Sequence, residues 1–304
     1  MLKDEKILIT GPAGQVAFPL ARELAKNNEV VGLARFSNPE DRDKVEAIGV
    51  KTVKFDLGAD SFDALDDDFT YVLNFAVAKS PDANFAYDLA ANAEGNGRLI
   101  KHSQKAKAFL YCSSTAVYAQ HSRDKLKENA ALGDSHLVLG MPTYSMSKIA
   151  AETVARFACA EWNVPTVIAR LNVPYGDNGG WPYFHLLMMM QGQEIALHSN
   201  KPNNYAPIHD DDVFAQTEKL LNVAAVPAVT VNWGGSEEVS IETWCEHLGE
   251  LTGLSPKIQY TENALGSISP DLTLMHKLIG RTTVPWRDGM KRMVKALQPD
   301  LLRA

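Results

Sequence analysis

The sequence has few cysteines, no run of basic residues and no long apolar stretch. Its three cysteines, Cys112, Cys159 and Cys245, lack metal-ligand spacing, and an odd number forms no closed set of disulfides. Sparse thiols of this kind favour a reducing compartment, so we expect a cytoplasmic protein. No uncharged run approaches the roughly 18–20 residues that span a bilayer. The first six residues carry too much charge for a signal peptide.

The charge balance and the lack of repeats exclude further classes of protein. There are 37 acidic and 30 basic residues, a net charge of −7, which argues against the basic face that nucleic acids require. Low-complexity segments and internal repeats are absent from the sequence. The 45% hydrophobic and 22% charged content are typical of a globular protein. We therefore expect a small-molecule ligand, with no metal, nucleic acid or membrane partner.

Short apolar runs alternate with amphipathic segments over the first 171 residues. The predicted strands cover residues 6–10, 29–35, 51–57, 70–77, 108–114 and 165–171, and the predicted helices cover residues 15–27, 38–49, 83–106 and 143–163. This alternation predicts an α/β fold of the Rossmann type, a doubly wound parallel sheet with both faces covered. After about residue 176 the alternation weakens. We therefore expect a nucleotide-binding domain, residues 1–175 with 207–233, and a discontinuous substrate lobe, residues 176–206 and 234–304.

The first predicted strand leads into the sequence TGPAGQVA, which has small residues at Gly11, Gly14 and Ala17. Gly11 permits a tight turn, Gly14 lets the backbone approach a pyrophosphate, and Ala17 lets the following helix pack on the strand. The helix N-terminus then presents free N–H groups to the phosphates. The strand before and the helix after favour a dinucleotide site over a plain turn, with Gln15 and Val16 as further contacts.

The end of the second predicted strand bears on which dinucleotide binds. An NAD site would place a carboxylate there, on the ribose 2′-hydroxyl, but the sequence has Ala34 followed by Arg35. A guanidinium pairs with a 2′-phosphate, so Arg35, with Ser37 and Arg42, favours NADP(H) over NAD(H). The alternative is a solvated surface arginine.

Two residues of the sequence PTYSMSK, Tyr144 and Lys148, lie one turn apart on a single face of a predicted helix. Such a pair is usually an ordinary surface pair, but an ammonium can also lower the phenol pKa from its usual value near 10. The segment 111–119, YCSSTAVYA, ends a predicted strand at the edge of the sheet where ligands bind. A serine there can hydrogen-bond a carbonyl oxygen while the tyrosine exchanges a proton.

Together these motifs resemble the extended short-chain dehydrogenase/reductase superfamily, in its NAD(P)-dependent epimerase/dehydratase family. Their order and intervals fit over nearly the whole chain. The matching segments are TGPAGQVA (10–17), FDL (55–57), NAEGN (92–96), SSTAVYA (113–119), YSMSK (144–148) and VNWGGSEEVSI (231–241).

The resemblance implies roles for particular residues. Tyr144 would be the general acid/base, Lys148 would lower its pKa and bind the nicotinamide ribose, and Ser114 would supply the catalytic hydroxyl. Asn92 would be a structural and proton-relay residue. The resemblance also implies a homodimer, formed through the helices that contain Asn92 and Tyr144. The remaining implied cofactor contacts are Asp56 and Leu57 at the adenine and Phe75, Ala76 and Val77 at the adenosine ribose and pyrophosphate.

The sequence departs from the family pattern where nucleotide-sugar members hold their substrate. Val173 stands at an asparagine position, and Tyr205 replaces an arginine that pairs with the sugar nucleotide's diphosphate. Without that guanidinium a diphosphate would be poorly held. Trp181 opens a segment rich in aromatic residues and methionine, which either lines an adaptable apolar pocket or packs the lobe's own core. The expected substrate contacts are Ser114, Val173, Trp181 and Tyr205.

These features predict an NAD(P)-dependent oxidoreductase that transfers hydride between NADP(H) and a non-nucleotide carbonyl or alcohol. Two alternatives stay open. One is an epimerase or dehydratase that uses the nucleotide without net redox change. The other is a non-catalytic nucleotide-sensing protein, although such a protein has little need for all three of Tyr144, Lys148 and Ser114. The run Asp210 to Asp212 is interpreted as the start of a helix, because aspartate is favoured there.

Overall fold

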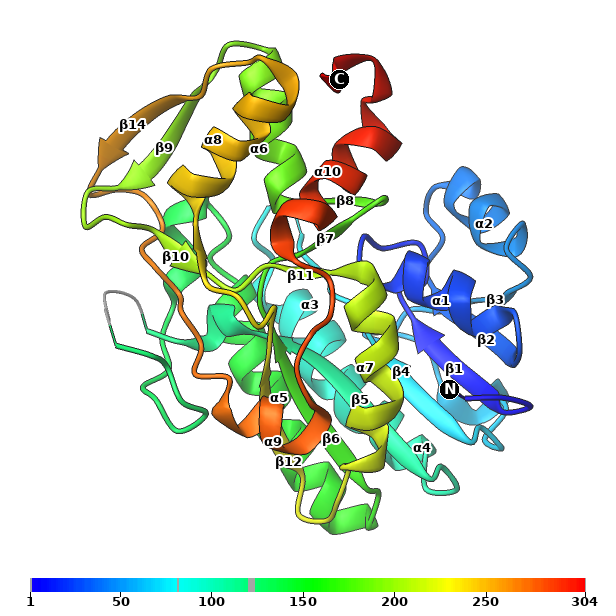
Figure 1. The fold of residues 1–304 in the computed structure, drawn as a ribbon. Coiled ribbons are helices and arrows are strands. Elements are labelled where there is room, and N and C mark those ends of the chain that lie inside the picture. Colours follow the sequence, from blue (N-terminus) through cyan, green and yellow to red (C-terminus); the bar gives the residue numbers. More distant parts are fainter. Residues whose placement is uncertain (1, 81, 120–123, 304) are drawn as a thin grey trace.

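The largest sheet has seven parallel strands in the order β12-β6-β5-β4-β1-β2-β3 (Figure 1). The computed structural model describes residues 2–80, 82–119 and 124–303. The seven strands are β1 (Lys6–Thr10), β2 (Glu29–Ala34), β3 (Lys51–Lys54), β4 (Tyr71–Asn74), β5 (Ala108–Ser114), β6 (Thr166–Leu171) and β12 (Val229–Trp233). The central strands β5 and β6 are buried along nearly their whole length, which explains their continuous apolar sequences. The predicted Rossmann-type fold is confirmed.

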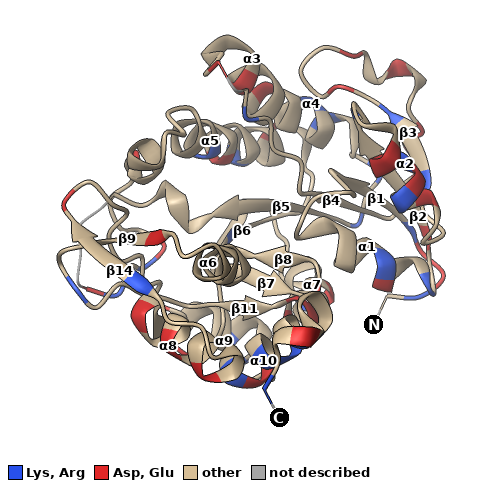
Figure 2. Ribbon diagram, turned by 90° about the horizontal axis from the view of Figure 1, so that it is seen from above, with Lys and Arg blue, Asp and Glu red and all other residues tan. Residues whose placement is uncertain are grey.

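Helices cover both faces of this sheet (Figure 2). Helices α1 (Ala17–Ala25) and α7 (Asp210–Asn222) lie on one face, and their apolar residues share a core with β1 and β6. Helices α4 (Gly95–His102) and α5 (Tyr144–Trp162) lie on the other face. Helix α2 (Pro39–Glu46) connects β2 to the edge strand β3.

The helix predicted over residues 83–106 has three consecutive parts. They are α3 (Phe85–Leu89), a π-helical turn (Ala90–Glu94) and α4 (Gly95–His102). A single π turn inside a helix frequently marks a functional site. Here the π turn carries Asn92, which the resemblance singled out.

Most of the chain after residue 173 forms a second lobe with its own core. Trp244, Tyr205 and Leu186 are among the residues buried there. Its elements are β7 (Pro174–Gly176), β8 (Gly179–Gly180), α6 (Trp181–Met190), β9 (Glu194–His198), β10 (Asn204–Tyr205), β11 (Ile208–His209), β13 (Val239–Ser240), α8 (Ile241–Thr252), β14 (Lys257–Thr261) and α10 (Trp286–Leu297). Short 3₁₀ helices cover Phe62–Ala64, Thr115–Val117, Ser135–Leu139 and Pro299–Leu301.

One segment of the expected substrate lobe packs elsewhere. Helix α9 (Thr273–Ile279) contacts α7 and β12, and its Met275 and Ile279 belong to the core beside the large sheet. We therefore propose a division into two lobes that differs from the expected one in assigning α9 to the nucleotide-binding domain.

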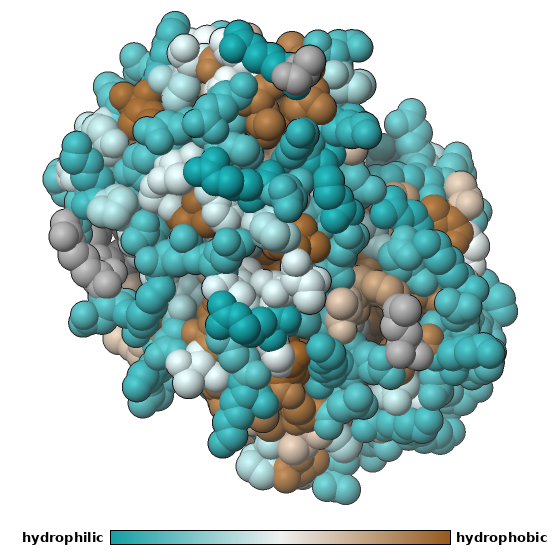
Figure 3. Space-filling model, viewed as in Figure 1, coloured by the Kyte–Doolittle hydropathy of each residue, from teal (hydrophilic) through white to brown (hydrophobic). Residues whose placement is uncertain are grey.

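The surface is mainly polar on the face seen in Figure 1. Figure 3 shows hydrophilic residues over most of this face, with the hydrophobic ones in separate small patches. In the part of the chain that the structure describes, no helix has the length and apolarity needed to cross a bilayer.

Candidate functional site

The glycine turn lies where the strand order of the sheet reverses, between β1 and β4. Gly11 has a φ of +65°, and a Cβ there would come within 3.0 Å of the Ala76 backbone. The Thr10 hydroxyl oxygen accepts hydrogen bonds from the backbone N–H groups of Phe75 (3.1 Å) and Ala76 (2.9 Å). Thr10 in turn donates to Asn74 Oδ1 (2.6 Å). The glycine turn and the loop after β4 are thus fixed together at the position where such folds bind ligands.

A cavity of about 460 Å³ opens at the carboxyl ends of β1, β2 and β4. It brings together most of the residues predicted to bind the cofactor. They are Gly11, Gly14, Arg35, Ser37, Asp56, Leu57, Phe75, Ala76 and Val77. Gln15 and Val16 line a neighbouring cavity instead. Arg42 lines neither of these two cavities, because its side chain bonds Glu46 (3.0 Å) and Thr52 (2.8 Å).

Arg35 is held at the rim of this cavity by a residue that the sequence did not single out, Tyr87. Arg35 Nη1 donates to the Tyr87 hydroxyl (2.8 Å), which donates to Asp56 Oδ2 (2.9 Å). Burial raises the pKa of Tyr87, and the Asp56 carboxylate raises it further. Because Tyr87 stays protonated, it links the two predicted adenosine-binding residues, and Arg35 keeps further N–H donors for a ligand.

The neighbouring cavity, of about 590 Å³, brings together three of the four predicted catalytic residues, while the fourth, Asn92, lines the first cavity. Ser114 ends β5, Tyr144 begins α5 and Lys148 follows one turn later. The predicted substrate contacts Val173, Trp181 and Tyr205 line it too. The two cavities share four residues: Gly11, Gly14, Phe75 and Val77. A ligand that extends from the first cavity past the glycine turn would therefore reach Ser114 and Tyr144.

The pKa of Tyr144 shifts in the direction opposite to the one predicted. Burial raises it, and the contact with the Ser114 hydroxyl acts more weakly in the lowering direction. Lys148 is not among the causes of this shift; its buried Nζ donates to the Cys112 carbonyl (2.7 Å), and burial lowers the pKa of Lys148 itself. The raised pKa keeps Tyr144 protonated at neutral pH, which is the state that a proton donor needs.

Asn92 uses its amide to fix the backbone. Its Oδ1 accepts from the Ala78 N–H (2.7 Å), and its Nδ2 donates to the Ala78 carbonyl (2.8 Å) and to Ser147 Oγ (3.2 Å). These bonds tie the loop after β4 to α5. They give Asn92 a positioning role, and a part in proton relay stays a proposal.

Two residues beside Tyr144 have no recognisable signal in the sequence. The His136 ring lies 5.1 Å from the Tyr144 ring, centroid to centroid. Lys79 Nζ lies 5.7 Å from the Tyr144 ring centroid. Both line the catalytic cavity. A single histidine in a 3₁₀ helix and a single lysine in a loop belong to no spacing pattern, so only the tertiary structure reveals them.

Tyr205, which stands in place of the family's diphosphate-binding arginine, is hydrogen-bonded within the protein. The Tyr205 hydroxyl donates to the Gly266 carbonyl (2.7 Å), and its buried ring meets Trp181 edge to face at 5.0 Å. Asn172, one residue before the family's asparagine position, is also engaged, with Thr115 Oγ1 (2.8 Å) and the Ala206 N–H (2.7 Å). Among the described residues that line this cavity there is no arginine, aspartate or glutamate.

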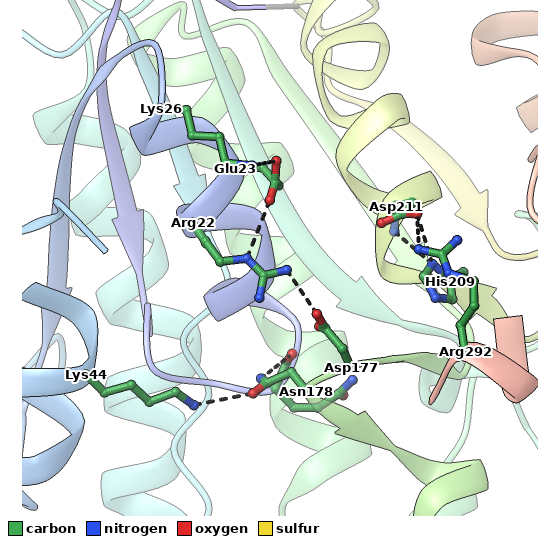
Figure 4. Close-up of polar contacts among 10 residues, drawn as sticks. Arg22, Glu23, Lys26, Lys44, Asp177, Asn178, His209, Asp211 and Arg292 are labelled. Atoms are coloured by element: carbon green, nitrogen blue, oxygen red, sulfur yellow. Dashed lines mark hydrogen bonds and ion pairs between the residues drawn. The ribbon is translucent and has the colours of Figure 1, made fainter. Parts of the chain in front are cut away.

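The turn between β7 and β8, in the second lobe, is bound to the glycine turn and α1 by hydrogen bonds and an ion pair (Figure 4). Asn178 Nδ2 donates to the Gln15 carbonyl (2.9 Å), and Lys44 Nζ donates to Asn178 Oδ1 (3.3 Å). Arg22 of α1 pairs with Asp177 at 3.2 Å. The glycine turn and the β7–β8 turn of the second lobe are therefore held together directly.

Val173 carries backbone strain at the edge of the catalytic cavity. It has a φ of +37°, and β-branched residues strongly disfavour this left-handed region. Replacing Val173 with Asn, which tolerates that region, should raise stability by about 1 kcal/mol and Tm by about 2 °C. Thermal unfolding checks this, with Val173→Thr as the control that keeps the β-branch. Equal Tm values for the two variants would contradict the strain.

Residues 7–213 match the family model described as the NAD dependent epimerase/dehydratase family, and the chain belongs to this family. It is thus an enzyme of the extended short-chain dehydrogenase/reductase superfamily, as the motifs predicted. A trifunctional UDP-glucose 4,6-dehydratase/UDP-4-keto-6-deoxy-D-glucose 3,5-epimerase/UDP-4-keto-L-rhamnose-reductase of Arabidopsis thaliana is 25% identical over 95% of this chain, which spans 46% of that protein. An uncharacterized UDP-glucose epimerase of Bacillus subtilis is 22% identical, with 87% of each chain covered.

Solved structures share the fold. A UDP-glucuronic acid 4-epimerase from Bacillus cereus, in complex with UDP-glucuronic acid and NAD, has a TM-score of 0.81 and 20% identity, covering 97% of this chain and 99% of that one. A UDP-N-acetylglucosamine 4-epimerase from Methanobrevibacter ruminantium has a TM-score of 0.83 and 14% identity, covering 98% and 100%. At these identities the likeness concerns the fold alone.

Proposed function

We propose that the protein transfers hydride between a nicotinamide dinucleotide and the carbonyl or alcohol carbon of a non-nucleotide substrate. The observation that most supports this proposal is that Ser114, Tyr144 and Lys148 line one cavity. This cavity shares Gly11 and Gly14 with the cavity lined by the predicted dinucleotide-binding residues. A bound nicotinamide dinucleotide supplies or accepts the hydride. In the reducing direction Ser114 donates a hydrogen bond to the carbonyl oxygen, and Tyr144 gives that oxygen its proton.

The residues present fit such a dinucleotide. A Cβ at Gly14 would lie 3.1 Å from the Gly11 carbonyl oxygen, a crowded contact, and glycine here leaves the backbone open to a pyrophosphate. Lys148, held on the Cys112 carbonyl, lies within the same cavity as Tyr144 and can donate to a ribose hydroxyl.

The lining of the catalytic cavity supports a substrate without a diphosphate. The Tyr205 hydroxyl is already hydrogen-bonded to the Gly266 carbonyl. No described residue of the lining is an arginine that could pair with phosphate oxygens. The absence of a carboxylate from the described lining also disfavours dehydration, which needs an acid and a base in addition to the redox step. The apolar lining instead suits a carbonyl that carries an aryl or alkyl group.

A cofactor-oxidation assay tests the proposed function. The purified protein is incubated with NADPH and a panel of aryl and alkyl ketones and aldehydes, and consumption of NADPH is followed. Net oxidation that matches alcohol formation one to one is expected, and Ser114→Ala should slow it by about 10- to 100-fold. Conversion of a substrate with no net change in NADPH would contradict net redox chemistry.

The second candidate is epimerisation of a nucleotide sugar without net redox change. It is favoured by the family and by the two relatives, both named for UDP-sugar reactions. Incubation with UDP-glucose and catalytic NAD, followed by NMR analysis of the sugar, distinguishes it. An epimerised product would establish this candidate in place of the first.

The proposed cofactor is NADP(H), on the strength of Arg35 and Ser37 at the rim of the cavity. The Bacillus cereus structure contains NAD, which supports a nicotinamide dinucleotide here and favours NAD, so the proposal of NADP(H) rests on Arg35 and Ser37 alone. Replacing Arg35 with Ala should weaken NADPH binding by about 10- to 100-fold, because a charge-assisted contact is lost, and leave NADH binding nearly unchanged.

Fluorescence titration with both nucleotides measures this preference. Arg42→Ala is the matched control, since Arg42 lies on the adjacent helix and lines neither cavity. The NADP assignment would be contradicted if Arg35→Ala lost affinity equally for NADPH and NADH. It would also be contradicted if the wild type bound NADH more tightly than NADPH.

We also propose a homodimer formed through α5 and the helix that contains Asn92, and a cytoplasmic location. Exposed apolar side chains on α5, Met146 and Phe157, support the interface. Three free, buried cysteines suit a reducing compartment. Analytical ultracentrifugation of wild type and Phe157→Glu tests the dimer, and a wild-type monomer would refute it.

A further inference from the structure

The hydrogen bonds of His136 define which of its ring nitrogens carries a proton. Ser135 Oγ donates its hydrogen to the Ala116 carbonyl at 2.9 Å. The same Oγ lies 3.0 Å from His136 Nδ1 and can therefore only accept there. Nδ1 must carry a hydrogen, which leaves Nε2 as an acceptor in the neutral ring.

The surroundings of His136 keep the ring neutral. Burial lowers its pKa to about 4, and the positive charge of Lys79 lowers it further. Nε2 has no hydrogen-bond partner among the residues that the structure describes. The ring therefore brings an unsatisfied acceptor to the wall of the catalytic cavity, in contact with the Tyr144 ring.

Most other polar groups of this lining donate hydrogen bonds or are bonded within the protein. Lys79 and Lys148 only donate, the hydroxyls of Tyr144, Ser114 and Thr115 both donate and accept, and both amide atoms of Asn172 are hydrogen-bonded within the protein, which leaves the Gln15 amide oxygen as a further acceptor. A substrate hydroxyl that donates a hydrogen bond would find its complement in His136 Nε2. Because the two ring centroids lie 5.1 Å apart, a group on the carbon next to a carbonyl held at Tyr144 is placed near His136.

We propose that His136 is a substrate-binding residue that accepts a hydrogen bond from a hydroxyl group next to the reacting carbonyl. The preferred substrates are then α-hydroxy ketones or aldehydes, or the corresponding vicinal diols in the oxidising direction. This inference rests on the proposed hydride transfer and adds its substrate class. His136 selects the substrate, while proton transfer stays with Tyr144.

A pair of nearly isosteric ketones tests the inference. Phenacyl alcohol and propiophenone differ by a hydroxyl in place of a methyl group beside the carbonyl, and their aryl group suits the apolar lining. With NADPH, the wild type should favour phenacyl alcohol in kcat/KM by about 10-fold or more. His136→Phe should bring this ratio close to one, mainly by lowering kcat/KM for phenacyl alcohol.

His136→Gln, which restores an acceptor, should recover part of the preference. Leu137→Ala, an exposed position on the same 3₁₀ helix, should leave it unchanged. A wild-type ratio near one, or an equal loss for both ketones in His136→Phe with the ratio preserved, overturns the inference while hydride transfer stands. If the wild type reduces neither ketone nor any other carbonyl tested, the proposed function fails and the inference fails with it.

Discussion

Replacing Tyr144 with phenylalanine is expected to lower kcat by about 10²- to 10⁴-fold, the range typical for loss of a general acid. The phenyl ring still packs against His136, so the cavity keeps its shape while the proton donor is lost. Cofactor binding should change little, because the dinucleotide cavity is lined by other residues. Steady-state reduction of a ketone and fluorescence titration with NADPH measure the two effects separately.

Tyr183→Phe is the matched control. Tyr183 lies in α6 outside both cavities, and its hydroxyl accepts a hydrogen bond from Gln298 (2.9 Å). Loss of the Tyr183 hydroxyl should leave kcat near the wild-type value. Turnover by Tyr144→Phe within about tenfold of wild type would contradict the assignment. A parallel loss of NADPH binding would show a structural defect in place of a chemical one.

Removing the charge of Asp210 should stabilise the protein above neutral pH. Asp210 is the first residue of α7 and is 7% exposed, and neither carboxylate oxygen has a hydrogen-bond partner within residues 2–80, 82–119 and 124–303. Burial raises its pKa to about 7, with further raising by Asp177 and Asp211 and opposition from Arg22. The folded protein must therefore either keep a proton on Asp210 or bury an unsatisfied charge.

The pH dependence follows from the sign of this shift. Asp210 binds its proton more tightly in the folded protein than in the unfolded chain, where the pKa is 3.8. Its contribution to stability is complete below pH 3.8 and is lost as pH rises through about 7, a loss on the order of 4 kcal/mol. Asp210→Asn should raise the free energy of unfolding by about 2 kcal/mol at pH 8. The gain is smaller than the full loss because the asparagine amide is also buried without a partner. Thermal unfolding should show a gain of about 4 °C at pH 8 and none at about pH 4.

Asp211→Asn provides the comparison on the same helix. Asp211 is exposed and pairs with Arg292 at 2.6 Å (Figure 4), so its loss should cost a little stability at pH 8. If Asp211→Asn raised Tm at pH 8 as much as Asp210→Asn, the stabilisation would come from the change in net charge and not from removal of the buried carboxyl group. No gain for Asp210→Asn at pH 8 would contradict the raised pKa.

Local patterns were enough to predict the nucleotide-binding half. The apolar strands β5 and β6 are recognisable because both faces of a parallel sheet are covered, and the glycine turn because Gly11 needs a positive φ. The run of aspartates was predicted to start a helix, and α7 does begin at Asp210. Tyr144 and Lys148 stood out because their spacing places them on one face of a helix, whereas Ser114 and the roles of all three residues were predicted from the resemblance to the family.

The remaining features depend on how distant segments approach one another. The pKa of Tyr144 was predicted in the wrong direction because the sequence does not show how deeply the Tyr144 side chain is buried. His136 and Tyr87 reach the cavities from segments without a motif. The burial of Asp210 is likewise invisible in the run of three aspartates, because only the tertiary structure sets Asp210 against Gly176.

The most direct measurement follows the hydride itself. NADPH deuterated at the transferable position of the nicotinamide is incubated with the protein and phenacyl alcohol, and the diol product is analysed by mass spectrometry. We expect one deuterium on the new carbinol carbon for each NADPH oxidised, with deuterated product formed about 10²- to 10⁴-fold more slowly by Tyr144→Phe. A product without deuterium, or deuterated product formed equally well by Tyr144→Phe, would contradict this expectation.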